Sequence, residues 1–385
     1  MDKICKDELC TGCSTCSSGC PKQCISMVQD DEGFYRPVVD QAQCIECGIC
    51  RKLCPINNSP VDDRKKPLSF AAYSVDEEIR LSSSSGGIFT ILAEEIIDRG
   101  GVVFGARYDD AFNVEHIVAR DKSELLKMRG SKYVQSKIGE IYRKTRIYLE
   151  QGDTVLFTGT PCQIGGLYAY LKKDYDNLYT QDIICHGVPS PLIWRRYLSF
   201  IETENHSKAT SVEFRNKSTG WKQYSLFINL ENGSSYQMRN IEDTYLRSFI
   251  MNMTLRQSCE NCLFKHIHRQ ADITLSDFWG IEEIMPDWND NRGTSIVMIH
   301  SPKGKELFDA ISDRICRKEV SFDSCIKFNP SMINATGYNY LRKRFIRDCK
   351  TMPFERVYQK YCGSSALSKL RRKMALIIRK IKVIL

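Results

Sequence analysis

Beyond residue 67 the apolar positions switch repeatedly between the spacings of strands and helices. Residues 70–75 and 102–106 are short apolar runs typical of strands. Between them, residues 88–99 carry apolar side chains at helical spacing, and Gly100 favours the end of that helix. This order of strand, helix and strand predicts an α/β fold for the larger part of the chain.

The same alternation in the middle of the chain brings two cysteines to equivalent places. Residues 153–157 and 178–184 are apolar strands, and a helix that begins at Pro161 connects them. Cys162 and Cys185 each follow the carboxyl end of one of these strands. A βαβ crossover makes the two strands parallel, so both thiols are predicted at one edge of the sheet, where open α/β folds bind ligands.

Other patterns predict that the α/β part also contains antiparallel strands. Residues 113–119 have the alternation of a hairpin strand. Three runs around the turn dipeptide Asn232–Gly233 predict an antiparallel meander over 211–216, 223–230 and 234–238. The remaining predicted elements are helices at 138–149, 241–251 and 303–315 and strands at 271–275 and 294–300.

The C-terminus has a separate, basic pattern. Apolar residues of 366–385 fall on one helical stripe, with the basic residues mostly opposite. Residues 364–385 hold seven lysines and arginines and no acid, against a net charge of +8 for the chain. Such a helix binds an anionic membrane surface or a partner, or docks as an ordinary terminal helix. The small net charge elsewhere argues against a nucleic-acid surface, and no run is apolar over the roughly 18 residues of a membrane helix.

The first 55 residues contain the spacing C-x-x-C-x-x-C-x-x-x-C-P twice, at an offset of 34 residues. This is the pattern of bacterial two-cluster ferredoxins, in which the fourth cysteine of each run ligates the other cluster. A zinc site is the alternative, but zinc has no use for the third closely spaced cysteine. Cys5 and Cys24 do not share the repeat and are predicted to be free buried thiols. The predicted ligands are Cys10, Cys13, Cys16 and Cys54 for one [4Fe–4S] cluster and Cys44, Cys47, Cys50 and Cys20 for the second.

A further cysteine pair has metal-ligand spacing. Cys259 and Cys262 form a C-x-x-C motif, and with Cys162 and Cys185 they make a candidate four-cysteine site. The alternatives are a redox dithiol beside two small buried thiols, or a zinc site. A third cluster is consistent with the ferredoxin motif, because electrons need a further acceptor.

Two loops are candidates for binding an anion. Residues 82–87, S-S-S-S-G-G, precede a predicted helix and present hydroxyl and backbone N–H groups that suit a phosphate; a flexible helix cap is the alternative. In residues 129–136 a turn at Gly130 and Ser131 is followed by Lys132, which offers a cation or is an ordinary solvated lysine. After the strand at 271–275, Asp277 and Trp279 either line a pocket or, in the case of Trp279, belong to the core.

Several motifs together resemble one known family. T-G-T-P-C-Q at 158, I-C-H-G-V-P-S at 184, C-E-N-C at 259 and A-D-I-T-L-S-D-F-W-G at 271 follow S-S-G-G and R-G-S-K-Y-V-Q-S in order. This set is similar to the coenzyme F-420 hydrogenase/dehydrogenase beta-subunit family, over about residues 10–315. One departure is Ser276, where glycine is expected. The family comprises iron–sulfur flavoproteins that bind FAD and move electrons between a hydride carrier, often F-420, and iron–sulfur centres.

The resemblance implies roles for particular residues. The implied flavin-binding residues are Ser85, Gly86, Gly87, Ser131, Lys132, Thr158, Gly159 and Thr160. It also implies that Cys162, Cys185, Cys259 and Cys262 suit an additional cluster. Lys132 is the first candidate for a cation close to the flavin, where it would stabilise negative charge on the reduced cofactor.

The expected protein is therefore an iron–sulfur flavoprotein oxidoreductase of α+β or α/β class. Its predicted parts are a two-cluster ferredoxin domain at 1–60, the two halves of a flavin-binding domain at 67–150 and 151–330, and a helical basic tail at 331–385. The alternative is an electron-transfer subunit without its own substrate, and a zinc-bearing nucleic-acid protein is a third possibility. The N-terminus has no apolar signal-peptide core, so the expected location is the cytoplasm or, through the tail, the inner face of the membrane.

Overall fold

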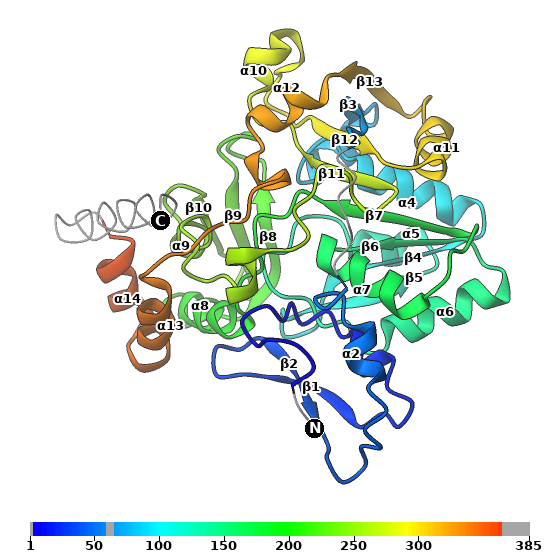
Figure 1. Cartoon of the computed structure of the whole chain (residues 1–385). Coiled ribbons are helices and arrows are strands. Elements are labelled where there is room, and N and C mark those ends of the chain that lie inside the picture. The colour runs from blue at the N-terminus through cyan, green and yellow to red at the C-terminus, as the bar shows by residue number, and fades with distance from the viewer. Residues whose placement is uncertain (1–2, 59–64, 364–385) are drawn as a thin grey trace.

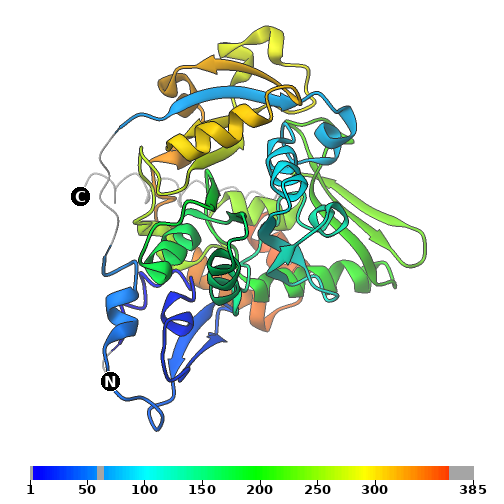
Figure 2. The same ribbon diagram turned by 90° about the vertical axis from the view of Figure 1, so that its right-hand side faces the viewer.

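A small N-terminal module lies against one side of a much larger α/β unit in the computed structural model, which describes residues 3–58 and 65–363 (Figures 1 and 2). The module has one antiparallel pair of strands, with Ile25 opposite Val39, and two short helices. Its core consists mainly of cysteines with Ile4 and Ile25. The elements are α1 (Thr15–Ser18), β1 (Ile25–Gln29), β2 (Tyr35–Val39) and α2 (Ile49–Leu53).

An eight-stranded mixed sheet forms the centre of the larger unit, in the order β13-β3-β12-β11-β7-β6-β4-β5. Its central strands β4, β6, β7 and β11 are parallel, and antiparallel strands lie on both sides. The parallel pairing of the strands before Cys162 and Cys185 is confirmed. The strands are β3 (Leu68–Ser74), β4 (Val102–Tyr108), β5 (Val114–Ala119), β6 (Val155–Thr158), β7 (Leu178–Ile183), β11 (Ile273–Asp277), β12 (Ser295–Ile299) and β13 (Ile315–Val320).

Helices cover both faces of this sheet. Because successive strand residues point to opposite sides, each strand contributes side chains to two cores. Val103 and Leu156 pack in one core with α4 and α11, whereas Phe104 and Phe157 pack in another with α6 and α7. Strands buried on both faces have apolar side chains at every position, which explains the continuous apolar runs of β4 and β6. The helices are α4 (Ile88–Asp98), α5 (Lys122–Leu126), α6 (Ile141–Gln151), α7 (Pro161–Leu171) and α11 (Pro302–Ala310).

A further core, apart from the two on the faces of the large sheet, lies between a three-stranded meander and four helices. The meander confirms the turn at Asn232–Gly233, and its order is β10-β9-β8. Trp194 and Tyr197 of α8 pack against it, and Phe354 of α14 stacks edge-on against Tyr197. Residues 342–361 are thus two helices built into a core, while residues 366–385 of the predicted amphipathic tail lie outside the described residues. The elements are β8 (Ala209–Asn216), β9 (Ser225–Leu230), β10 (Ser235–Arg239), α8 (Pro191–Glu204), α9 (Thr244–Ile250), α13 (Arg342–Thr351) and α14 (Phe354–Tyr361).

One predicted helix was too long. The helix expected over 303–315 ends at Ala310, and Ile315 begins strand β13. This strand pairs antiparallel with β3, so a distant partner decides its conformation. The remaining short elements are α3 (Glu77–Ser82), α10 (Ile281–Ile284), α12 (Phe322–Lys327) and 3-10 turns at Gln257–Asn261, Pro286–Trp288 and Pro330–Met332. Within the described ranges, no helix is both long and apolar enough to cross a membrane.

The N-terminal module is fixed to the large unit by buried contacts. The hydroxyl of Thr15 donates to the carbonyl of Gly166 in α7 at 2.9 Å, and Arg143 of α6 donates to the carbonyls at the end of α1. On the other side, Arg342 of α13 pairs with Glu32 in the turn between β1 and β2. The side chain of Arg342 is only 3% exposed, whereas that of Glu32 is 29% exposed, so the cation is buried and the carboxylate remains partly in contact with solvent.

Gly33, next to Glu32, should be needed for this docking. Its φ is 84°, and a Cβ there would lie 2.4 Å from the Cβ of Leu192 in α8. We expect G33A to lower the free energy of unfolding by about 2–4 kcal/mol, because backbone strain and overpacking add. The matched control is G100A, with φ 78° and no atom within 4 Å of the added Cβ, which should cost about 1 kcal/mol. Equal losses in urea unfolding would contradict the docking contact.

Candidate functional site

Two small cavities in the N-terminal module are each lined by cysteines from both halves of the repeat. The first is lined by Cys10, Cys13, Cys16 and Cys54. The second is lined by Cys20, Cys44, Cys47 and Cys50. The structure thus groups the eight cysteines in the same two sets as the spacing. Since each cavity is completed by the last cysteine of the other run, the two sites are interdependent.

Each cavity also contains a fifth thiol. Cys5 lines the first, and hydrogen bonding to Cys10 and Cys54 raises its pKa. Cys24 lines the second, with its sulfur 3.5 Å from that of Cys20. Cys24 is buried and Cys5 half-buried, so both predicted free thiols lie directly beside the candidate ligands.

The two halves of the repeat also share backbone geometry. Gly12 and Glu46, 34 residues apart, have φ of 70° and 53°, and Ser14 and Gly48 have φ of 69° and 71°. Each pair precedes a short helix, α1 or α2. Residues with positive φ allow a loop to turn tightly, so the cysteine loops of the two halves have the same curved backbone.

The third group of four cysteines, in the large unit, also converges. Cys162 is in the first turn of α7, Cys185 follows β7, and Cys259 and Cys262 are in and just after a 3-10 turn. Burial, with the neighbouring thiols of the group, raises the pKa of Cys185 to about 11 and that of Cys259 to about 12. The thiol of Cys162, whose pKa is also raised by burial, lies 3.2 Å from the hydroxyl of Thr160. Among residues 3–58 and 65–363, no three His, Cys, Asp or Glu side chains are arranged to hold a single metal ion.

A cavity of about 330 Å³ lies between these cysteine groups at the ends of β6 and β7. Its walls include Thr11 and Gly12 from the ferredoxin loop and Cys162 from the four-cysteine group. The structure therefore brings one pocket into contact with both. Of the predicted flavin-side residues, it places seven in the wall: Ser85, Gly87, Ser131, Lys132, Thr158, Gly159 and Thr160.

Gly86 has a supporting position behind this wall. Its N–H donates to the hydroxyl of Ser295 at 2.9 Å, and a Cβ would lie 2.5 Å from the carbonyl oxygen of Ala72. Only glycine therefore lets this loop approach the sheet so closely.

The donors around the cavity suit a phosphorylated cofactor. Helix α4 begins at Ile88. Its N-cap residue, Gly87, has φ 87° and provides no side-chain cap, so the first N–H groups of the helix are left for a ligand. The hydroxyls of Thr11 and Ser83 are buried in the same wall without a hydrogen-bond partner within the described parts of the chain. Unpaired buried donors are costly unless a ligand satisfies them. The residues present thus fit the diphosphate and polar edges of a flavin nucleotide.

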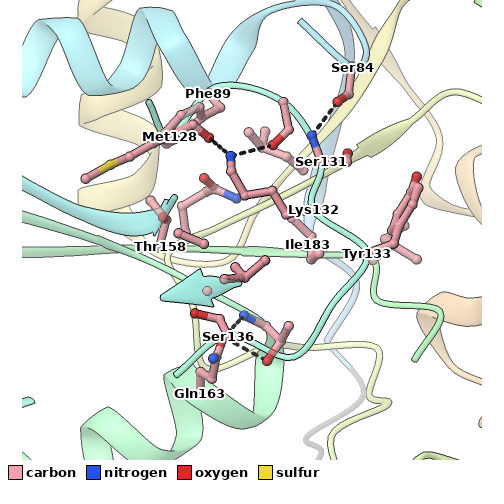
Figure 3. Close-up of a pocket in the computed structure, with 18 of the residues that line it drawn as sticks. Ser84, Phe89, Met128, Ser131, Lys132, Tyr133, Ser136, Thr158, Gln163 and Ile183 are labelled. Atoms are coloured by element: carbon pink, nitrogen blue, oxygen red, sulfur yellow. Dashed lines mark hydrogen bonds between the residues drawn. The ribbon is translucent and has the colours of Figure 1, made fainter. Parts of the chain in front are cut away.

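Lys132 provides a half-buried amine in this wall. Its Nζ donates to the carbonyl of Met128 at 3.1 Å (Figure 3) and to those of Arg129 and Gly130, each at 3.2 Å. Burial lowers the pKa of Lys132 to about 7, so its charge responds to a nearby anion close to neutral pH. Because its amine donates to three backbone carbonyls, Lys132 is not the ordinary solvated lysine that the sequence also allowed.

His116 is a wall residue that sequence reasoning missed. Its ring contacts the hydroxyl of Ser136 at 2.5 Å and the carbonyl of Thr158 at 3.1 Å. Burial lowers the pKa of His116 to about 4, so the ring is neutral at pH 7. A neutral ring donates from Nε2 to the carbonyl and accepts at Nδ1 from the serine hydroxyl. It positions the two flanking segments.

The serine-rich loop is held from the meander, also by residues that sequence reasoning missed. Arg215 makes a two-pronged ion pair with Asp277 at 2.9 and 2.8 Å and donates to the carbonyl of Ser84 at 3.2 Å. Lys217 donates to the carbonyls of Arg80, Ser85 and Arg292 at 2.6–2.7 Å. Asp277 lines the cavity as considered from sequence, whereas Trp279 stacks on Trp221. No sequence signal connects β8 to this loop.

Grouped cysteines in a ferredoxin-like module, beside a cofactor-sized pocket on an α/β sheet, define the class of iron–sulfur redox proteins. Residues 9–58 match the 4Fe-4S dicluster domain. Residues 69–142 match the N-terminal part, and residues 152–323 the C-terminal part, of the coenzyme F-420 hydrogenase/dehydrogenase beta subunit. The chain belongs to this beta-subunit family and carries an N-terminal dicluster domain, which implies two [4Fe–4S] clusters. The predicted family is confirmed.

Similarity to individual proteins is more distant. An uncharacterized protein of Methanocaldococcus jannaschii is 25% identical over 201 residues, which cover 44% of this chain and 54% of that protein. The chain thus spans about half the length of this curated relative. Among solved structures, a chain of the F-420-reducing [NiFe] hydrogenase complex from Methanosarcina barkeri is similar with a TM-score of 0.49 and 19% identity, over 75% of this chain and 94% of that one. Similarity at this level defines neither a substrate nor a partner.

Removing the charge of Asp277 should destabilise the loop around the cavity. The side chain of Arg215 is 4% exposed, so D277N leaves a buried cation without its counter-ion. We expect a loss of about 3–5 kcal/mol in the free energy of unfolding, measured in urea. The control E95Q breaks the surface pair of Glu95 with Arg99 and should cost less than about 0.5 kcal/mol. A D277N protein as stable as E95Q would contradict the assigned role.

Proposed function

We propose that the protein is an iron–sulfur flavoprotein oxidoreductase. It passes electrons between a hydride carrier, such as F-420, or another reducible substrate, a bound FAD and [4Fe–4S] clusters. The observation that carries this proposal is the shared cavity, whose wall contains both the Thr11–Gly12 loop of the ferredoxin module and Cys162. A cofactor held there touches two candidate electron routes at once.

The flavin is assigned to the cavity by its donors. The N–H groups at Gly87 and the start of α4 would take the diphosphate, and the segments at Ser131 and Thr158–Thr160 would flank the rest of the cofactor. When bound, a flavin accepts two electrons with a proton and releases the electrons singly. The chain orients the cofactor through the loop that Arg215 and Lys217 hold.

The cysteine assignments are part of the same proposal. Four thiolates are the usual ligation of a [4Fe–4S] cluster. Cys10, Cys13, Cys16 and Cys54 hold one cluster, and Cys20, Cys44, Cys47 and Cys50 hold the second. Cys162, Cys185, Cys259 and Cys262 hold a third. Val188 donates its N–H to the sulfur of Cys259 at 3.4 Å, as backbone amides do to cluster thiolates.

A second candidate function is an electron-transfer subunit that serves a larger redox complex. The favouring observation is that the second cysteine cavity opens towards the surface: Cys47 is exposed, and the neighbouring Ile45 is 58% exposed. An exposed apolar residue beside a cluster suits transient docking of a redox partner. In this function the flavin site stays empty. For either function we propose a cytoplasmic location, with contact at the inner membrane face through residues 366–385.

The flavin, iron and sulfide content of the purified protein distinguishes the two functions. A bound flavin whose absorption bleaches on reduction, together with iron and sulfide, supports the oxidoreductase. Iron and sulfide without flavin would leave the electron-transfer subunit as the better description.

Loss of Cys162 should remove one of three clusters. We expect C162S to lower iron and sulfide per chain by about one third, since three ligands hold a [4Fe–4S] cluster less well than four. The control is C316S, at a half-buried cysteine of β13 outside all three groups. Iron analysis of anaerobically prepared protein provides the measurement. Equal iron in both variants would contradict the third cluster.

Lys132 should favour the reduced form of the flavin in a pH-dependent way. At pH 6 we expect K132M to lower the ratio of reduced to oxidised flavin at a fixed potential by about tenfold, because the ammonium no longer stabilises negative charge. The difference should shrink above pH 7, since burial lowers the pKa of Lys132 to about 7 and the wild type then also loses this charge. Spectroscopic redox titration measures the ratio. K127M, at an exposed lysine, is the control, and a pH-independent difference would contradict the role.

A further inference from the structure

Arg256 is a fully buried cation at the contact between the N-terminal module and the large unit. Only 1% of the residue's surface is exposed to solvent. Nε donates to the carbonyl of Cys10 at 2.7 Å and Nη2 to the carbonyl of Tyr35 at 3.0 Å. Nη2 also lies 3.6 Å from the sulfur of Cys10. A full positive charge therefore lies directly beside one predicted cluster ligand.

The backbone of Arg256 belongs to the other cysteine group. It precedes the 3-10 turn Gln257–Asn261, and its carbonyl accepts from the N–H of Cys259 at 3.0 Å. Its own N–H donates to the carbonyl of Val188, whose N–H in turn contacts the sulfur of Cys259. One residue thus joins the first ferredoxin cavity to the four-cysteine group.

Among the described residues, the hydrogen bonds of this guanidinium go to two carbonyl oxygens and to the Cys10 sulfur, and none goes to a carboxylate. Nη1 is buried and has no hydrogen-bond partner within the described residues. A Cβ on Gly12 would lie 3.1 Å from Nη1 and 2.7 Å from the carbonyl oxygen of Tyr35, so the Cys10–Cys13 loop approaches the charge closely. A buried charge without a counter-ion is costly, which points to an anion beside it. A cluster with thiolate ligands supplies one.

Arg36 is a second cation that interacts with the Cys10 thiol, and it provides a useful contrast. Its Nε pairs with the carboxylate of Asp30 at 2.9 Å, and the two side chains are 19% and 26% exposed. Its charge is therefore largely balanced and partly screened by water. Within the described parts of the chain, no carboxylate pairs with Arg256, and its side chain is shielded from water.

We propose that Arg256 sets the reduction potential of the cluster held by Cys10, so that this cluster accepts electrons from the pocket more readily. The proposal rests on the proposed function, because the ligand set belongs to it. Reduction adds one electron and one negative charge to the cluster, breaks no bond and leaves the guanidinium protonated. A fixed cation close to a ligand sulfur stabilises that added charge, since buried charges are poorly screened.

The experiment is a redox titration of the full-length protein, prepared without oxygen, with the clusters followed by electron paramagnetic resonance. The signal that C13S alters identifies the Cys10 cluster. In R256Q and R256M we expect the ratio of reduced to oxidised Cys10 cluster at a fixed potential to fall about tenfold, which corresponds to about 59 mV for a one-electron couple. The second ferredoxin cluster should not change. R256K keeps the charge and should remain within about threefold of wild type. R36Q removes a cation that also interacts with Cys10 but is paired with Asp30, so it should shift the ratio less than R256Q does.

The outcomes are distinct. An unchanged Cys10 cluster in the neutral variants, or an equal shift of both ferredoxin clusters, would overturn the proposal. If R256Q does not retain its iron, R256M decides, because its apolar chain preserves packing beside Phe34. Loss of the cluster in both neutral variants and retention in R256K would make Arg256 a structural support and also overturn it. Wild-type protein without iron, or with signals that C13S does not alter, would instead refute the ligand assignment of the proposed function.

Discussion

The parallel pairing of β4, β6, β7 and β11 is the constraint on which the rest of the structure depends. Parallel strands end at the same edge, so the loops after β6 and β7 meet although a whole helix separates them in sequence. Cys162 and Cys185 are brought together in this way, and the cavity opens beside them. The N-terminal module then approaches this edge through Gly12 and the contact of Thr15 with Gly166. The sheet thereby places the cavity between the cysteines of the N-terminal module and the four-cysteine group of the large unit.

A second feature of the site is a set of lysines and arginines with little exposure to solvent. Arg215 and Arg256 are buried, Lys132 and Lys217 are half-buried, and all four donate to main-chain carbonyls. Of these, Arg215 is neutralised by a two-pronged ion pair with Asp277. Carbonyl dipoles hold such cations in place but do not cancel their charge. The surroundings therefore favour negatively charged occupants: phosphates, a reduced cofactor and clusters with thiolate ligands. Binding of these groups and stability of the apo-protein are opposed, because each occupant relieves a repulsion that the empty site retains.

Features determined by local spacing could be predicted from the sequence, and features determined by distant partners could not. The cysteine repeat, the meander around Asn232–Gly233 and the parallel strands of a βαβ unit are short-range patterns. In contrast, Arg256 meets Cys10 across 246 residues, and β13 is a strand because β3 lies beside it. An arginine looks alike in sequence whether it is buried or solvated. The pocket itself could be suspected from its loops, but the residues that hold those loops could not.

The crossed arrangement of the two cysteine runs has a consequence for how the protein is made. Each cavity of the module needs a cysteine from the opposite run, with Cys54 closing the first and Cys20 contributing to the second. Neither half of the repeat forms a complete set of four cysteines by itself, so a nascent chain completes no set until Cys50 has left the ribosome. The two sets are completed only four residues apart, at Cys50 and at Cys54, and a chain interrupted between the runs completes neither.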